Sequence, residues 1–462
     1  ELHEKEKKKM LFSLTNPEIA ILMMGIFLFA VLLGFPIAFT LMAMGLGFGY
    51  YAYFDPTKME HLLDNRIFQL FVQNTYTVMD NNVLTAVPLF LFMGYLVERA
   101  GIVAKLFFAI RLASHKLPAS MAVAALITCT LFSTATGIIG AVVTLMGLLA
   151  WPAMVKAGYD KKFASGIICA GGCLGILIPP SIMLIVYSVI AQLSPLRLFA
   201  AAIFPGLMLA GLYIGYAIFR AWLNPSIAPK PAAEEIPPTA LIMKEVIVSF
   251  LPLFSLIILV LGTILAGIAT PAEAAAVGAF GALVLSYFYK TLKWKNFKES
   301  VFLTAKTTAM IMWLFIGSWT FASVFSYLGG HEVFEHFFKS LNLQPWQFLV
   351  ITQIIIFLLG WPLEWTEILI IFVPIFLPLV EFFGVNPYFF AMLIALNLQT
   401  SFLTPPMAMS AYYLKGVQSK NVELMEIFRG IMPFLAIVIF AMVLMYWFPG
   451  IALWLPETLF AN

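Results

Sequence analysis

Charged residues are scarce in this chain. Lys, Arg, Asp and Glu together make up 11% of its 462 residues, whereas 62% are hydrophobic. A water-soluble domain with this composition would have too little polar surface to stay in solution. The formal net charge of only +3 also argues against nucleic acid as a partner. The sequence therefore predicts a membrane protein.

Residues that bind transition metals or perform catalysis are also few. The three cysteines are Cys129, Cys169 and Cys173, and no His or acidic residue near them completes a set of metal ligands. We expect these cysteines to be small packing residues. No nucleophile is paired with a base, so the sequence does not indicate an enzyme. No cleavable signal peptide is visible.

Long uncharged runs are plentiful instead. Residues 19–43 and 166–196 carry no charge, and each run is long enough to span a bilayer core of about 30 Å as a helix. The apolar residues do not alternate with a period of two, as they do in barrel strands. We predict an all-α polytopic membrane protein. The apolar runs predict helices at about 17–34, 36–54, 82–98, 197–219, 246–267, 271–289, 300–327 and 431–448, with surface helices within 55–80 and 105–116.

Two pairs of adjacent prolines interrupt long apolar runs. Pro179-Pro180 lies in the run at about 163–191, and Pro405-Pro406 lies 226 positions later in the run at about 388–414. A Pro–Pro step removes two N–H donors and its rings clash with upstream carbonyls, so each run is predicted to be a broken helix. In hydrocarbon, the freed backbone groups need a helix, a water or an ion as partner. Paired breaks of this kind point to the binding site of a transporter.

Two further apolar regions, at about 118–155 and 346–380, contain interruptions near residues 133–137 and 360–364. Each region is either one long helix or a re-entrant hairpin of two half-depth helices. Basic residues favour the hairpins, because only then do they separate onto two faces, with eighteen on one face and four on the other. The larger set, assigned to the cytoplasm, is Arg99, Lys105, Arg111, Lys116, Lys156, Lys161, Lys162, Arg220, Lys230, Lys244, Lys290, Lys293, Lys295, Lys298, Lys306, Lys415, Lys420 and Arg429. The smaller set is Lys58, Arg66, Arg197 and Lys339.

This topology makes the two halves mirror each other. The first hairpin opens to the cytoplasm and the second opens to the outside. The spacing from hairpin to proline pair is similar, with 43 residues from Thr136 to Pro179 and 41 from Glu364 to Pro405. We therefore predict two inverted-topology repeats, which allow one site to alternate between the two sides of the membrane.

The predicted domain boundaries follow from these repeats. The first repeat covers residues 10–223, a polar, proline-rich cytoplasmic linker covers 224–245, and the second repeat covers 246–462. Residues 1–9 are expected to be a charged linker or an expression remnant. Four lysines in this tail conflict with its placement outside, which we attribute to an upstream segment such as a fused partner.

The breaks offer oxygen ligands and helix N-termini. Hydroxyls and freed carbonyls suit Na⁺, and helix N-termini suit an anion. At the first site we expect Thr134, Thr136 and Gly137 to face Gly171, Gly172, Gly175, Pro179, Pro180 and Ser181. The second site is expected to contain Gly360, Glu364, Thr366, Gln399, Thr400, Ser401, Thr404 and Pro406.

Three acidic residues have alternative interpretations. Glu364 and Glu367 lie deepest in the second hairpin, and an ionised carboxylate is expensive there without a partner. They either bind an ion or proton, or they occupy a tip that reaches water. Glu273 follows Pro271 at a helix start, where a carboxylate favours the helix dipole, so we expect it to cap the helix.

Four segments resemble the large membrane subunit of tripartite ATP-independent periplasmic (TRAP) transporters, within the ion-transporter superfamily. The likeness covers nearly the whole chain from Met10. The matching segments are Gly34-Phe35-Pro36-Ile37-Ala38-Phe39, Gly175-Ile176-Leu177-Ile178-Pro179-Pro180-Ser181, Gly267-Ile268-Ala269-Thr270-Pro271-Ala272-Glu273-Ala274 and Leu403-Thr404-Pro405-Pro406. One such segment is weakly specific, but four in order across two halves are highly specific.

The resemblance implies a secondary transporter of the bacterial inner membrane. It implies import of a small organic anion, a carboxylate or sulfonate, together with two or more Na⁺ ions. The mechanism would be an elevator motion of a hairpin-bearing transport domain against a scaffold. The implied partners are a small four-helix membrane subunit and a soluble periplasmic substrate-binding protein.

The resemblance also implies site residues. Relatives build the first Na⁺ site from a Ser-Gly-Ser tip and carbonyls before the proline pair. Here the matching tip is Thr136-Gly137-Ile138, where Ile138 offers only a carbonyl, with Gly172, Gly175, Ile178 and Pro180 opposite. The second tip often reads Gly-Met-Phe-x-Asp, and here it reads Gly360-Trp361-Pro362-Leu363-Glu364.

The expected ligands form two sets. The Na⁺ ligands are Thr136, Gly137, Gly172, Gly175, Ile178, Pro180, Gly360, Glu364, Thr366, Ser401, Thr404 and Pro406. The substrate ligands are Thr134, Ser181, Gln399 and Ser401. The alternative function is a stand-alone Na⁺- or H⁺-coupled anion symporter of the same superfamily that uses no binding protein. A passive channel is disfavoured, because paired breaks interrupt any continuous pore.

Overall fold

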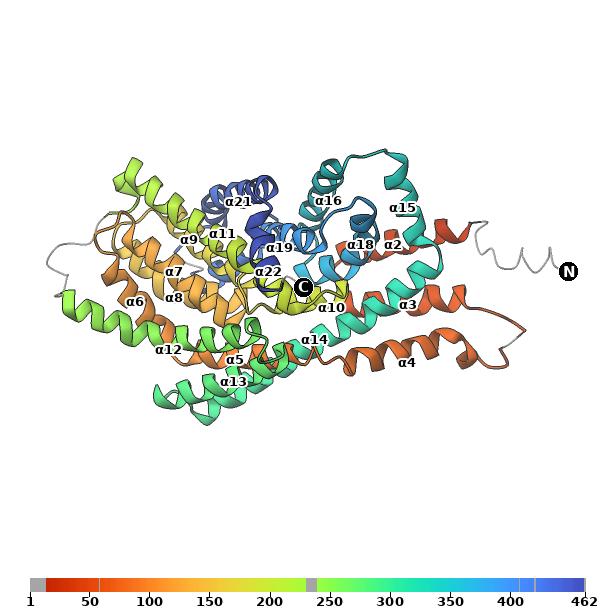
Figure 1. Cartoon of the computed structure of the whole chain (residues 1–462), viewed down its shortest axis with the longest axis horizontal. Coiled ribbons are helices and arrows are strands. Elements are labelled where there is room, and N and C mark those ends of the chain that lie inside the picture. The colour runs from red at the N-terminus through yellow and green to blue at the C-terminus, as the bar shows by residue number, and fades with distance from the viewer. Residues whose placement is uncertain (1–13, 58, 230–238, 407, 419–420, 461–462) are drawn as a thin grey trace. The chain divides into compact units, whose positions relative to one another are not determined.

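The structure is a computed structural model that describes residues 14–57, 59–229, 239–406, 408–418 and 421–460 (Figure 1). All the secondary-structure elements assigned in these ranges are helices, which confirms the predicted all-α class. Some sequence-based assignments lie outside the described residues. They are the tail 1–9, the centre of the linker 224–245, and the basic residues Lys58, Lys230 and Lys420.

The chain forms two compact units. Unit 1 comprises Glu1–Asn81, Ala309–Thr352 and Pro362–Val385, and unit 2 comprises Asn82–Thr308, Gln353–Trp361 and Asn386–Asn462. Two of the passages from one unit to the other lie within helices, namely α14 (Trp294–Tyr327) and α16 (Pro345–Leu359). Unit 2 contains residues from both sides of the linker, so the two compact units do not correspond to the two predicted repeats. The repeats stay a prediction.

Unit 1 has an aromatic core. Its complete helices are α2 (Asn16–Leu32), α3 (Ile37–Ala52), η1 (Leu62–Asp64), α4 (Arg66–Met79), α15 (Gly330–Ser340), α17 (Trp365–Glu367), the π-helix η5 (Ile368–Phe372) and α18 (Val373–Phe382). The ring centroids of Phe27 and Phe321 lie 5.5 Å apart, and the Phe321 and Phe325 rings stack at 6.0 Å. A Cβ added at Gly317 would lie 2.8 Å from the carbonyl oxygen of Ala38, so α14 packs closely on α3 through this glycine.

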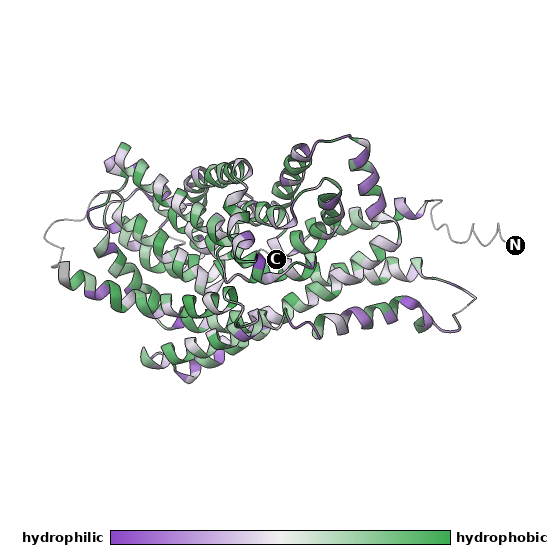
Figure 2. Ribbon diagram, in the orientation of Figure 1, coloured by the Kyte–Doolittle hydropathy of each residue, from purple (hydrophilic) through white to green (hydrophobic). Residues whose placement is uncertain are grey.

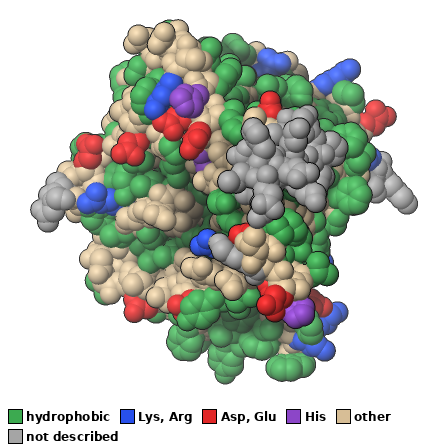
Figure 3. All heavy atoms as spheres, turned by 90° about the vertical axis from the view of Figure 1, so that its right-hand side faces the viewer, with side chains coloured by type: hydrophobic (Ala, Val, Ile, Leu, Met, Phe, Trp, Pro, Cys, Tyr) green, Lys and Arg blue, Asp and Glu red, His purple; other side chains and the backbone are tan. Residues whose placement is uncertain are grey.

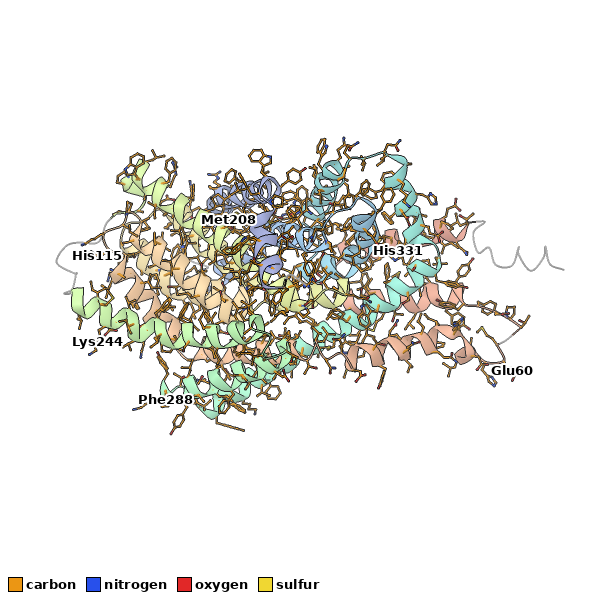
Figure 4. The ribbon with its side chains drawn as sticks, viewed as in Figure 1. Glu60, His115, Met208, Lys244, Phe288 and His331 are labelled. Carbon is orange, nitrogen blue, oxygen red and sulfur yellow. The ribbon has the colours of Figure 1, made fainter. Side chains whose placement is uncertain are left out.

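Unit 2 contains the first predicted hairpin and both predicted broken helices. Its complete helices are α5 (Ala86–Arg99), α6 (Ile102–Ala113), α7 (Ser120–Thr136), α8 (Ile139–Lys156), α9 (Lys161–Cys173), η2 (Leu174–Ile176), α10 (Ile182–Ala191), α11 (Pro195–Leu223), η3 (Pro225–Ile227), α12 (Thr239–Leu265), α13 (Pro271–Phe288), α19 (Pro387–Leu403), α20 (Met409–Val417), α21 (Leu424–Trp447) and α22 (Gly450–Leu459). Helices α7 and α8 lie side by side and both contact α9 (Figure 1). Helix α12 packs on α6, and Figure 4 labels Lys244 near the start of α12 and His115 just after α6.

The interruptions lie where the sequence places them. Helix α7 ends at Thr136, directly before Gly137, and α9 and α10 are separated around Pro179-Pro180. Residues 360–364 separate α16 from α17, and the second proline pair separates α19 from α20. Both Pro–Pro peptide bonds are cis. Glu273 caps α13 as predicted, because its carboxylate accepts a hydrogen bond from the Thr270 amide at 2.8 Å.

The surface is that of a membrane protein. Among the described residues, seven helices are long and apolar enough to cross a membrane, or up to eight with the bent pair α5–α6. Figure 2 shows hydrophobic residues along most helices, with hydrophilic residues gathered in α4 and α15. Much of the face in Figure 3 is hydrophobic, with charged groups scattered across it. Helix α8 and residues 365–382 both reach spanning length, so the re-entrant course of the hairpins stays a prediction.

The sequence did not predict α15, α22 or the three-residue η3. It predicted a helical region over 346–380, but not that Ile368–Phe372 forms the π-helix η5. Helix α15 is short and strongly amphipathic, with Phe338 buried and Glu332 exposed. It was not predicted because it contains no long apolar run. A π-helix has no distinct apolar period, and it arises where surrounding packing shifts the backbone register.

A very close helix crossing in unit 2 joins α9 to α21. A Cβ added at Gly166 would lie 2.2 Å from the carbonyl oxygen of Gly430. A Cβ at Gly430 would lie 2.0 Å from the carbonyl oxygen of Lys162. Backbone thus meets backbone, and no flexible side chain can move aside. The crossing brings a helix of the second half of the sequence onto the broken helix of the first half.

We therefore expect Gly166→Ala or Gly430→Ala to destabilise the protein. Forcing a methyl group against backbone separates the helices, and such overpacking costs about 1–3 kcal/mol. The thermal unfolding midpoint in detergent should fall, by about 2–4 °C per kcal/mol. The matched control is Gly211→Ala in α11, where a Cβ meets no atom within 4 Å. An equal effect in the control would contradict the importance of this crossing.

Candidate functional site

The first broken helix is interrupted between η2 and α10. All residues from Leu177 to Ser181 in this interruption are buried. The Ser181 hydroxyl donates a hydrogen bond to the carbonyl of Ile176 at 2.5 Å and accepts one from the Leu184 amide at 3.4 Å. Ser181 therefore caps α10 and satisfies a carbonyl upstream of the prolines. One of its two lone pairs remains for a ligand.

The first hairpin tip is a left-handed turn at Gly137. Its φ is +64°, a conformation that glycine adopts without steric cost. Its amide donates to the Ser133 carbonyl at 2.7 Å. Thr134 and Thr136 each donate their hydroxyl hydrogen to the carbonyl four residues earlier, at 2.6 and 3.0 Å. Because a hydroxyl that donates keeps both lone pairs, these oxygens can still coordinate a cation.

The tip packs directly on the broken helix. A Cβ at Gly175 would lie 2.7 Å from the Cβ of Ser133, and one at Gly172 would lie 2.3 Å from Cγ2 of Val143. These two glycines let the hairpin approach the backbone of the interruption. The structure therefore places the hairpin against Gly172 and Gly175 of the predicted first site, while Gly171 packs on Cys129 of α7. A Cβ at Gly137 would also lie 3.6 Å from the Ile182 side chain, at the start of α10.

Two neighbours of this site add information. A Cβ at Gly94 in α5 would lie 2.7 Å from the carbonyl oxygen of Thr136, so Gly94 supports the tip from the other side. The sequence analysis missed it, although a glycine among bulky residues signals close approach. Ile178 packs on α11, because a Cβ at Gly206 would lie 2.6 Å from its Cγ1. Because its side chain is apolar, Ile178 has only its carbonyl to offer a ligand.

The second broken helix repeats this pattern in part. After the proline pair, the Ser410 hydroxyl donates to the carbonyl of Phe402, upstream of the pair, at 2.7 Å. Ser410 thus plays the part that Ser181 plays in the first half, and the sequence analysis missed it. The hydroxyls of Ser401 and Thr404 donate to carbonyls three and four residues earlier, at 2.9 and 2.5 Å. Their lone pairs are also left for a ligand.

Pro406 differs from its counterpart Pro180. Pro180 is buried, whereas Pro406 is exposed. The carbonyl of Pro406 accepts a hydrogen bond from the Tyr412 hydroxyl at 2.9 Å. Its second lone pair is all that remains for an ion, so Pro406 fits an enclosed Na⁺ site less well than Pro180 does.

A buried amide cluster joins α16 to α19. The Asn397 amide donates to the backbone carbonyl of Gln353 at 2.7 Å and to its side-chain oxygen at 2.9 Å. The Thr400 hydroxyl donates to the Asn397 carbonyl at 2.6 Å. A Cβ at Gly360 would lie 3.0 Å from Cβ of Ser401, so the end of α16 packs on α19 one turn further along. The sequence analysis missed Asn397 and Gln353, although polar residues in apolar runs are a signal.

Gln399 is a buried polar residue of unit 2 whose side chain makes no hydrogen bond. It is fully buried, and neither its side-chain nitrogen nor its oxygen has a hydrogen-bond partner. An unpaired buried amide is unfavourable by several kcal/mol, roughly 2–7 kcal/mol. Gln399 lies about 200° around the helix from Asn397, so it faces away from the amide cluster. A polar ligand would satisfy both of its groups.

The remaining predicted residues of the second site belong to unit 1. Glu364 is half-buried and its carbonyl accepts the Ile368 amide at 3.2 Å. Thr366 is 3% exposed and its hydroxyl has no hydrogen-bond partner. Because Gly360 and Ser401 lie in unit 2, the gathering of this second set around one ion stays a prediction.

The chemistry of these donors is that of an alkali cation and an anion. The described residues contain no group of three or more His, Cys, Asp or Glu that could hold a metal ion. The first site offers neutral hydroxyl and carbonyl oxygens, which are ligands for hard cations. Its residues therefore fit Na⁺ better than a transition metal.

Comparisons with known proteins agree with this geometry. Residues 24–451 match the family described as the tripartite ATP-independent periplasmic transporter, DctM component. The C4-dicarboxylate TRAP transporter large permease protein DctM of Pseudomonas aeruginosa is 30% identical over 81% of this chain and 86% of its own. The sialic acid TRAP transporter large permease protein SiaM of Vibrio cholerae is 31% identical over 82% of this chain and 87% of its own.

A solved structure shares the fold. The YdaH transporter of Alcanivorax borkumensis superposes with a TM-score of 0.59 at 15% identity, over 89% of this chain and 96% of the other. The family match covers most of the chain, and the relatives are transporter permeases, not enzymes. This chain therefore belongs to the DctM family, as the large membrane subunit of a TRAP transporter and a multi-pass protein of the bacterial inner membrane.

Proposed function

We propose that this protein imports a small organic anion together with Na⁺ by an elevator-type alternating-access mechanism. Two or more Na⁺ ions accompany each anion. The observation that carries the proposal is the first hairpin tip. There, Thr134 and Thr136 keep their lone pairs free, and the tip packs against Gly175 and Ile182 on either side of the buried interruption between η2 and α10. Neutral hydroxyl and carbonyl oxygens can bind a hard cation without supplying a formal counter-charge. The bound cation then attracts the anion.

The two halves support a pair of related sites. Ser181 and Ser410 each donate to a carbonyl on the upstream side of a proline pair. Helix α11, which follows the first broken helix, contacts α19, and α21, which follows the second, contacts α9. Such reciprocal packing is what two inverted repeats, 10–223 and 246–462, would produce.

The substrate is a carboxylate or a sulfonate. The named substrates of the two relatives, a C4-dicarboxylate and sialic acid, both carry carboxylates. The candidate ligands are neutral donors: Thr134, Ser181, Gln399 and Ser401. Gln399 is buried with both amide groups unpaired, so it can donate to an anionic oxygen and accept from a substrate hydroxyl.

The proposed partners are a small four-helix membrane subunit and a soluble periplasmic substrate-binding protein. The family name carries both "tripartite" and "periplasmic". The alternative is a stand-alone Na⁺- or H⁺-coupled anion symporter of the same superfamily, and it differs in needing no binding protein.

We expect uptake into proteoliposomes to require three conditions. These conditions are the presence of the two membrane subunits, the loaded binding protein on the outside, and an inward Na⁺ gradient. Radiolabelled C4-dicarboxylates, sialic acid and a sulfonate are measured with each condition omitted in turn. Free substrate should not be taken up without the binding protein. Equal uptake in its absence would establish the stand-alone alternative, and uptake that ignores the Na⁺ gradient would reject sodium coupling.

We expect Thr136→Val to weaken the coupling to sodium. The change removes one oxygen ligand and keeps the side-chain shape, so the Na⁺ concentration for half-maximal uptake should rise about tenfold. The matched control is Thr130→Val on the same helix, since Thr130 makes the same kind of bond to a carbonyl four residues earlier, at 2.7 Å. Thermal stability should change little in either variant. An unchanged Na⁺ dependence for Thr136→Val would remove this ligand from the first site.

An elevator requires the hairpin and the broken helices to move as one body. Helix α8 is fixed to α20, because a Cβ at Gly147 would lie 2.9 Å from Cγ2 of Val417. The buried Gln418 amide also donates to the Gly147 carbonyl at 2.8 Å. A Cβ at Gly140 would lie 3.0 Å from the Tyr413 ring. These contacts support a hairpin that does not open by itself.

We expect a disulfide between Gly147→Cys and Val417→Cys to leave uptake largely intact. Cγ2 of Val417 is bonded to the Val417 Cβ, so its contact with the added Cβ at position 147 brings the two Cβ atoms close enough for a disulfide. Uptake is measured in proteoliposomes after oxidation and again after reduction. The single-cysteine variants serve as controls. Abolition by oxidation and recovery on reduction would show that the hairpin opens as a gate.

A further inference from the structure

The second hairpin carries a buried carboxylate that the proposed sites do not use. Glu367 is 5% exposed, and its Oε2 has no hydrogen-bond partner. It ends α17 and directly precedes the π-helix η5. The sequence alone left open whether Glu367 meets water at the hairpin tip, and its burial rejects that alternative. Glu364, three residues earlier, is half-buried, so the two acids differ in environment.

The helical turn that follows Glu367 is buried. The next four residues, Ile368 to Ile371, are 0–4% exposed, and four consecutive residues cover the whole circumference of a helix. The carboxylate therefore cannot reach solvent by facing outward. An uncompensated ionised group in such an apolar place is very unfavourable. Glu367 needs either a cation or a proton to neutralise it.

The chain itself offers no cationic partner nearby in sequence. Residues 340–414 contain no Lys, Arg or His. Among the described basic residues of unit 1, Arg66, His61 and His336 are exposed. Lys339 is hydrogen-bonded to Glu335. The ring of His331, labelled in Figure 4, packs against Phe325 with centroids 5.5 Å apart.

Neutral oxygen ligands are present beside the carboxylate. The neighbouring Thr366 is 3% exposed and its hydroxyl has no hydrogen-bond partner. In the π-helix, the Ile370 carbonyl is held by the Ser318 hydroxyl of α14 at 3.1 Å, which fixes the backbone of this turn within unit 1. A hard monovalent cation prefers such oxygen ligands, and a carboxylate adds the charge that neutral sites lack.

We propose that Glu367 supplies a charged ligand for a sodium ion at the second hairpin, with the Thr366 hydroxyl as a neutral ligand. The site is distinct from the neutral first site, because the charge of its ion is neutralised by a carboxylate of the protein. The inference takes the identity of the ion from the proposed function, but binding is tested without transport.

The test measures how Na⁺ stabilises the purified transporter that contains the full chain. Thermal unfolding midpoints are recorded while NaCl replaces choline chloride at constant ionic strength, with KCl as a second probe. Glu367→Gln should raise the Na⁺ concentration for half-maximal stabilisation at least about tenfold. The variant should be at least as stable as the wild type without Na⁺, because an uncompensated charge is removed. Glu367→Asp, which keeps the charge, should retain much of the response.

The matched control is Glu381→Gln, on α18 of the same hairpin, where the carboxylate is exposed. It should leave the Na⁺ response unchanged. A wild-type response in Glu367→Gln would overturn the inference and leave sodium-coupled uptake standing. A wild type that is stabilised equally well by low pH without Na⁺, through Glu367, would overturn it in favour of a proton. Absence of any Na⁺ response in the wild type would overturn both this inference and sodium coupling.

Discussion

A helix that breaks inside hydrocarbon exposes carbonyls and amides that no water can satisfy. In this protein, serine side chains meet part of that demand. Ser181 and Ser410 each donate to a carbonyl upstream of a proline pair. At the first hairpin tip, Thr134 and Thr136 donate to their own helix. These donating hydroxyls keep their own lone pairs, and oxygen ligands in a dry place favour a cation.

Close packing of the hairpin on the broken helix allows these oxygens to serve as ligands. Gly175 and Gly172 let the tip reach the backbone of the broken helix, and Gly94 supports the tip from α5. Larger residues at these positions would hold the helices apart and admit lipid or water between them. The glycines therefore act through distance, and their effect on an ion would be indirect. The same reasoning explains why α9 and α21 cross at Gly166 and Gly430.

The breaks were predictable and their partners were not. Prolines and glycines act on their own backbone, so Pro179-Pro180, Pro405-Pro406 and Gly137 located the interruptions from sequence alone. Gly94, Asn397 and Gln353 owe their roles to neighbours far away in the chain, and a single sequence does not reveal those neighbours. The π-helix at Ile368–Phe372 was missed for a related reason, because its register depends on surrounding packing. Pro406 and Pro180 occupy matching positions in the two motifs, yet Pro406 is exposed and Pro180 is buried, a difference that the motif alone does not predict.

Charge balance links the two hairpins in the proposed mechanism. The first site has only neutral ligands, so a sodium ion there leaves a positive charge beside the hydroxyl donors. That charge is worth more at low dielectric than in water, and it favours an anion close by. A sodium ion at Glu367 is neutralised by the protein and attracts no anion. One ion would thus recruit the substrate while the other removes the penalty of moving a bare carboxylate through hydrocarbon. An empty transport domain would carry the uncompensated charge of Glu367, which disfavours its movement without sodium and so opposes uncoupled return.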